Sequence, residues 1–135
     1  ALKNQMKAEA AVMRALYYFH AVQLWGDIPL VTKAVHGVTA ENFEEIYSQV
    51  YPERKPLADA YQLIIQDLEG ALPNLSGTDK YKVTKGAALS LLAQVYATKP
   101  NPDYGKTISY IDQLSGYNLL PVFNQLFDGN HDANT

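Results

Sequence analysis

The sequence lacks cysteine, which excludes disulfide bonds and thiolate chemistry from its 135 residues. It also lacks an apolar run of about 18 residues, the length that a membrane-spanning helix needs. Like charges form no block: 11 basic and 14 acidic residues leave a net charge of −3. A basic patch is the usual footprint of a nucleic-acid-binding protein, so the charge pattern excludes that class too.

Patterns that carry catalysis or metal binding are missing as well. His20, His36 and His131 show no metal-ligand spacing such as HExxH, so we predict no metal site and no cofactor. The TKGAA segment (84–88) has one glycine and no GK[ST] ending, which excludes a phosphate loop. There is no GxSxG motif, and we expect helical carboxylates such as Glu69 to be solvated rather than paired as in a glycosidase. We therefore predict that the protein is not an enzyme.

What the sequence does contain is helical periodicity. Its 135 residues are 47% apolar, enough for one domain (1–135) with a substantial core. Apolar residues recur at helical spacing in four segments. The predicted helices cover about 5–25, 56–72, 85–98 and 103–114. A long insertion, 26–54, separates the first two and is predicted to hold a short helix near 41–51. Residues 117–135 are predicted to form one helical turn and then a disordered end.

The first predicted helix is the most apolar, and we expect it to lie at the centre of the molecule with neighbours on several sides. Gly26 is placed to end it in the left-handed conformation, and Pro29 prevents it from resuming. Two adjacent apolar stripes follow its length: Ala10, Met13, Tyr17, Ala21 and Leu24, then Ala11, Ala15, Tyr18, Val22 and Trp25.

Each of the other three helices has one apolar stripe that predicts its buried face. Pro56 suits the first position of the second helix, and Thr84 is a suitable N-cap for the third. The stripes are Leu57, Tyr61, Ile64, Leu68 and Ala71 or Leu72; Ala88, Leu91, Leu92 and Val95; and Ile108, Ile111 and Leu114. Short connections favour antiparallel pairing, so we predict an all-α fold of two tetratricopeptide-like hairpins, the first one split by the insertion.

A few polar or aromatic residues are candidates for function. Arg14 on an apolar helix predicts a structural ion pair, with Asp27 or Asp67 as the partner. Trp25 could stack on a sugar, but its place on an apolar stripe favours core packing. Tyr81, in a loop, is a second weak candidate for ligand binding.

Tyr47 and Tyr51 are further exposed candidates, and each of them is more often plain surface.

Four segments carry a family resemblance, and they occur in the family's order. Arg14-Ala-x-Tyr-Tyr18-Phe19, followed by Leu-Trp-Gly26-Asp27-Ile-Pro29-Leu30, resembles the "RA-x-YYF … L-[WY]-G-D-[VI]-P-L" signature of the SusD/RagB family. The later segments that resemble it are 61–71 (Y-x-x-I-I-x-D-L-E-x-A), 83–96 (VTKGAA-x-x-LLA-x-VY) and 103–127 (DY … SG-x-Y-x-L … LF).

The resemblance implies a function as well as a fold. Members of the family are outer-membrane lipoproteins on the extracellular face, which bind nutrient glycans and deliver them to a SusC-like TonB-dependent transporter. Their anchor is a lipidated N-terminal cysteine, which this chain lacks. We therefore expect an internal helical fragment of a SusD-like protein, with an oligosaccharide and the transporter as partners.

Two alternatives remain at this point: a tetratricopeptide-type scaffold for protein–protein interaction and a glycoside hydrolase domain. An Asn- and Lys-rich groove would favour the first, and two facing carboxylates the second.

Overall fold

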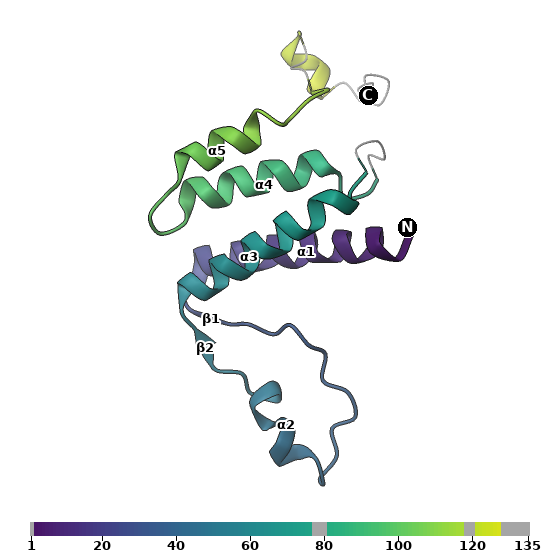
Figure 1. Ribbon diagram of the computed structural model, residues 1–135, viewed down its shortest axis with the longest axis vertical. Helices are drawn as coiled ribbons and strands as arrows, with labels where there is room; N and C mark the ends of the chain where they lie inside the picture. Colours follow the sequence, from purple (N-terminus) through teal and green to yellow (C-terminus); the bar gives the residue numbers. More distant parts are fainter. Residues whose placement is uncertain (1, 77–80, 118–120, 128–135) are drawn as a thin grey trace.

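The computed structural model describes residues 2–76, 81–117 and 121–127 and shows an all-α protein, as predicted (Figure 1). The predicted disordered end, 128–135, lies outside these residues. The α-helices are α1 (Leu2–Trp25), α2 (Phe43–Val50), α3 (Leu57–Ala71), α4 (Lys85–Thr98) and α5 (Tyr104–Ile111). Shorter elements are β1 (Ile28–Pro29), β2 (Arg54–Lys55) and the 3-10 helices η1 (Leu72–Asn74) and η2 (Phe123–Leu126). No described helix has both the length and the apolarity to cross a membrane.

Four helices pack in the order α1, α3, α4 and α5, and each runs antiparallel to the one before it; in Figure 1, α3 crosses in front of α1. We call these four packed helices the helical layer. The hairpins are α1–α3 and α4–α5, as the sequence predicts. The stripes predicted for α3 and α4 lie in the core, and they include Ile64, Leu68, Leu92 and Val95, the largest fully buried side chains. Thr84 caps α4 through a hydrogen bond from the Ala87 amide at 3.2 Å.

The prediction that α1 is the central helix is wrong. α3 is central, because it packs on α1 on one side and on α4 on the other. α1 lies at the edge of the layer and buries a single face, made of Ala8, Val12, Ala15, Phe19 and Val22. The first predicted stripe faces outward, and Leu24 on it is 71% exposed. Apolar spacing identifies a helical face that avoids water but not which element covers it, and none of the described elements covers this one.

The burial predicted for α5 is also wrong. Ile108 and Ile111 are exposed, whereas Tyr110 between them is buried against α3 and α4. Leu114, beyond the end of the helix, is half-buried against the core. The hydroxyl group of Tyr110 donates a hydrogen bond to Glu69 of α3, and this bond favours the orientation of α5 in which Tyr110 faces inward.

Residues 26–56, which we call the excursion, project from one end of the helical layer and contain α2 (Figure 1). Strands β1 and β2 pair antiparallel at its base, with Ile28 opposite Lys55 and Pro29 opposite Arg54. The two ends of the excursion are thus held together where α1 ends and α3 begins. Pro56, predicted to be the first helical residue, is instead the N-cap of α3, so the helix begins one residue later, at Leu57.

Candidate functional site

Arg14 makes the ion pair that the sequence predicts, and its partner is Asp67 rather than Asp27. Nε and Nη2 of Arg14 each donate to one carboxylate oxygen of Asp67, and both distances are 2.7 Å. The Asp67 side chain is only 11% exposed. This bidentate pair joins α1 to α3, so Arg14 is occupied within the fold and is not free for a ligand.

The Gly26-Asp27 motif has a structural explanation at the base of the excursion. Gly26 has φ +67°, and its amide donates to the Val22 carbonyl, which ends α1 in the left-handed conformation. The Asp27 carboxylate then accepts a hydrogen bond from the Leu57 amide at 2.8 Å. Asp27 therefore caps α3 from a distant part of the sequence.

Tyr18, Phe19, Pro29 and Leu30 complete the motif. The Tyr18 hydroxyl donates to the carbonyl of Val31 at 2.9 Å and accepts from its amide at 2.7 Å, which fastens the excursion to α1. Phe19 packs edge-on against Tyr61 of α3, with ring centroids 6.3 Å apart. The motif residues therefore hold the first hairpin together.

Replacing Asp27 by Ala tests this cap. We expect the variant to lose about 1 kcal/mol of unfolding free energy, because the first amide of α3 loses its acceptor. Asp27→Asn keeps an oxygen acceptor in the same place and is the matched control, expected to lose less than half as much. Urea denaturation of both variants measures the difference, and equal losses would contradict the capping role.

Sequence reasoning missed a polar contact centred on Glu69. One carboxylate oxygen of Glu69 accepts hydrogen bonds from Tyr110 at 2.6 Å and from Tyr96 at 3.1 Å, and the two tyrosine rings stack with centroids 5.6 Å apart. Burial, followed by the bond to Glu69, raises the pKa of Tyr96 to about 12 and that of Tyr110 further. Both hydroxyls therefore stay neutral donors, and they join α3, α4 and α5.

The two ligand candidates predicted from the sequence do not form one site. Trp25 ends α1 and is 64% exposed, so the interpretation that it packs in the core is wrong. Tyr81 is exposed just before α4. Figure 1 shows that α1 ends at the opposite end of the layer from the start of α4. Trp25 and Tyr81 therefore cannot contact the same small ligand.

Three exposed aromatic side chains, in contrast, do lie together along α2 and its C-cap residue. They are Phe43, Tyr47 and Tyr51, which we call the aromatic row. Adjacent ring centroids are 5.6 Å and 5.0 Å apart. The exposed fractions are 36%, 53% and 60%. The three residues are spaced four apart, and residues at this spacing are neighbours on one side of a helix. The row is a continuous aromatic surface.

Two hollows accompany these surfaces. A cavity of about 280 Å³ lies inside the excursion, between residues 30–33 and residues 48, 49 and 52. A groove of about 400 Å³ lies between α3 and the α4–α5 turn, where Tyr61, Tyr96 and Ile65 provide apolar lining and Gln62 and Asn101 are polar. Among the residues that the structure describes, no three His, Asp or Glu side chains are grouped to hold a metal ion.

Comparison with known proteins decides the family. A family model of SusD-like proteins, described as "Starch-binding associating with outer membrane", matches residues 2–97. The chain belongs to this SusD-like family. A SusD-like protein of Bacteroides ovatus is 30% identical over 147 residues, which cover 99% of this chain and 25% of that protein. SusD-like protein P2 of Formosa agariphila is 32% identical, over 96% of this chain and 25% of that protein.

The SusD-like fold also has a solved counterpart. A crystal structure with 28% sequence identity superposes with a TM-score of 0.68, over 93% of this chain and 26% of the other. The chain therefore spans about a quarter of the length of these relatives.

Proposed function

We propose that the protein binds nutrient glycans without cleaving them. The observation that carries the proposal is the match of residues 2–97 to a family described as starch-binding and associated with the outer membrane. The exposed rings of Trp25 and of the aromatic row are of the type that packs against the C–H faces of sugars. Binding energy would come from stacking and from hydrogen bonds to hydroxyl groups, with no bond broken.

We further propose that the glycan is passed to a SusC-like TonB-dependent transporter. The protein would act on the extracellular face of the outer membrane as the helical part of a longer lipoprotein, whose lipid-anchored cysteine lies outside these 135 residues. The description of the family as associating with the outer membrane supports the location, and the short coverage of the relatives supports the larger size. Co-purification of the intact protein with a TonB-dependent transporter would support the partner.

The structure gives less support to a peptide-binding tetratricopeptide scaffold. That alternative predicts a groove rich in Asn and Lys, whereas the groove beside α3 is mostly apolar and contains two tyrosines. Its one lysine, Lys99, already donates from Nζ to the Asn101 carbonyl at 2.6 Å. The groove therefore offers little free charge to a peptide terminus.

Affinity electrophoresis of the intact protein tests glycan binding. We expect its migration to be retarded in gels that contain a polysaccharide from a panel of plant and algal glycans, with no reducing sugar released during long incubation. A protein that binds no member of the panel would contradict capture. Release of reducing ends by the purified protein would contradict the non-enzymatic mechanism and favour the glycoside hydrolase alternative.

A further inference from the structure

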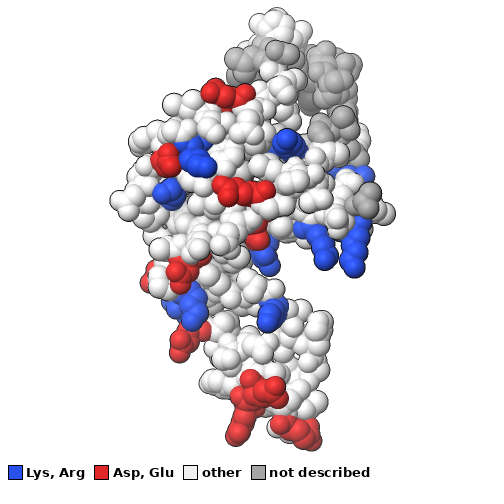
Figure 2. Space-filling model, viewed as in Figure 1, with Lys and Arg blue, Asp and Glu red and all other residues white. Residues whose placement is uncertain are grey.

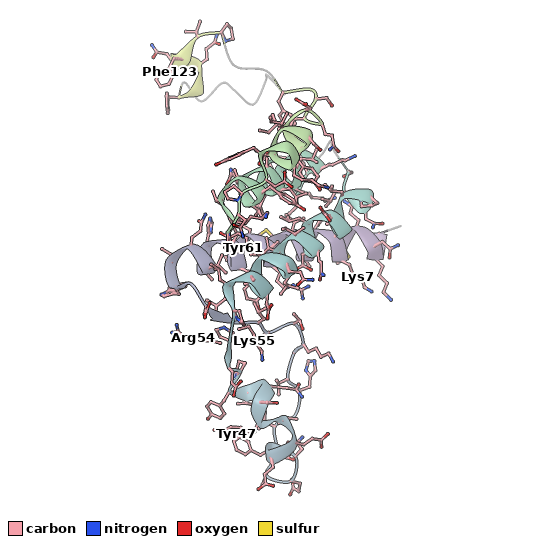
Figure 3. All side chains as sticks on the ribbon, turned by 60° about the vertical axis from the view of Figure 1, so that its left-hand side comes forward. Lys7, Tyr47, Arg54, Lys55, Tyr61 and Phe123 are labelled. Carbon is pink, nitrogen blue, oxygen red and sulfur yellow. The ribbon has the colours of Figure 1, made fainter. Side chains whose placement is uncertain are left out.

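The aromatic row is exposed because α2 lies on the excursion, away from the core helices. Figure 1 shows α2 on the excursion, apart from the layer of α1, α3, α4 and α5. In Figure 3, Tyr47 of α2 lies far from Tyr61, which is buried between the helices of the layer. Ile46 and Val50, the aliphatic side chains of α2, are half-buried, so the helix turns its aromatic side outward instead.

Polar groups that suit a sugar lie beside the rings. Glu44 is three residues before Tyr47, and Ser48 is three residues before Tyr51, so both neighbour the row on the helix surface. The hydroxyl groups of Tyr47 and Tyr51 have no hydrogen-bond partner among the residues that the structure describes. A carboxylate, a serine hydroxyl and two phenols can together accept from and donate to the hydroxyl groups of a sugar whose C–H face covers the rings.

The segment before α2 holds the row in a defined position. Asn42 accepts a hydrogen bond from the Thr39 amide at 2.9 Å and donates to the Gly37 carbonyl at 2.8 Å. Glu44 and Glu45 in the first turn stabilise the N-terminus of the short helix through its dipole. A preformed surface loses less conformational entropy on binding than a surface that must first become ordered.

Other occupants fit the row less well. The exposed part of three rings amounts to on the order of 300 Å², whereas a stable protein interface needs about 800 Å² from each partner. A helix that lies on a membrane carries Lys or Arg on its polar face, but α2 has Glu44 and Glu45 and no basic residue. Figure 2 shows acidic side chains at the outer end of the excursion.

We propose that the aromatic row of α2, with Glu44 and Ser48 beside it, is a contact site for neutral glycans. The site rests on the glycan-binding function proposed above and adds a location and a chemical class to it. Glu41, Glu44 and Glu45 select against uronate-containing and sulfated polysaccharides, because like charges repel one another within a Debye length of about 10 Å at moderate salt. The family description names starch, which is a neutral polymer.

The experiment compares two pairs of tyrosines in the intact protein. Tyr47→Ala combined with Tyr51→Ala removes two rings of the row, and we expect the dissociation constant for a bound neutral polysaccharide to rise about tenfold. Tyr17→Ala combined with Tyr104→Ala removes two exposed tyrosines from the helical layer and is the matched control, expected to leave binding unchanged. Affinity electrophoresis in amylopectin, laminarin and galactomannan, with alginate and polygalacturonate as anionic polymers, measures each variant.

The outcomes separate this site from the general function. If the unmodified protein binds no polysaccharide, glycan capture and the site both fail. If it binds and the row variant binds equally well, the site is wrong while capture stands. Glu41→Gln combined with Glu45→Gln removes two negative charges and keeps Glu44 in the contact site. This variant should strengthen alginate binding by at least about threefold at low salt and leave neutral binding unchanged. Alginate binding that exceeds neutral binding in the unmodified protein would overturn the chemical class.

Discussion

Leu92→Ala should destabilise the protein by about 2–5 kcal/mol, the range for truncating a fully buried leucine. Leu92 lies on α4 with 0% of its surface exposed, within the core shared with α3. The loss combines the transfer free energy of the deleted methyl groups with the cost of the cavity they leave. Chemical denaturation of the intact protein, with an unchanged dependence on denaturant concentration, measures it.

Leu24→Ala is the matched control for Leu92→Ala, because it makes the same chemical change at an exposed position of α1. We expect it to change the unfolding free energy by less than about 0.5 kcal/mol. A loss of under about 1 kcal/mol for Leu92→Ala, or equal losses for the two variants, would show that the core is elsewhere.

Breaking the Arg14–Asp67 pair should have the second-largest effect. Asp67→Ala leaves the Arg14 guanidinium at a partly buried position without its bidentate acceptor, and we expect a loss of about 1–3 kcal/mol. The effect is below that of a fully buried pair, because 36% of the Arg14 side chain is exposed and water can replace some of the lost bonds.

A double-mutant cycle isolates this pair. Arg14→Met keeps much of the apolar stem and removes the charge, so the variant with both substitutions should lose less than the sum of the single losses, by about 1 kcal/mol. Strictly additive losses would mean that the two side chains stabilise the hairpin independently of each other. The bidentate geometry at 2.7 Å predicts the opposite.

Some features of the fold could be predicted from the sequence because they are local. Gly26 ends α1 and Thr84 caps α4, since each acts within a few residues of itself. The buried stripes of α3 and α4 were also correct, because these helices have neighbours on the faces that their apolar residues mark.

The errors in the sequence prediction concern partners that are distant in the chain. α1 and α5 are the two edges of the layer, and an apolar stripe cannot tell an edge helix from a central one. The hydrogen bonds of Glu69 join it to tyrosines that follow it by 27 and 41 positions in the chain. No local sequence pattern predicts contacts over such separations. Tyr47 and Tyr51 could be named as exposed, but their alignment with Phe43 depends on the helix that α2 forms.

The closed base of the excursion has a consequence for how this scaffold can diversify. The β1–β2 bridge, the Asp27 cap and the Tyr18 bonds to Val31 all lie where the segment leaves and rejoins the helices. A doubling in loop length adds only about 0.6 kcal/mol of closure entropy once the ends are fixed. Residues 32–53 can therefore vary in sequence and length, and with them the ligand that the excursion contacts. The packing of the two hairpins stays the same.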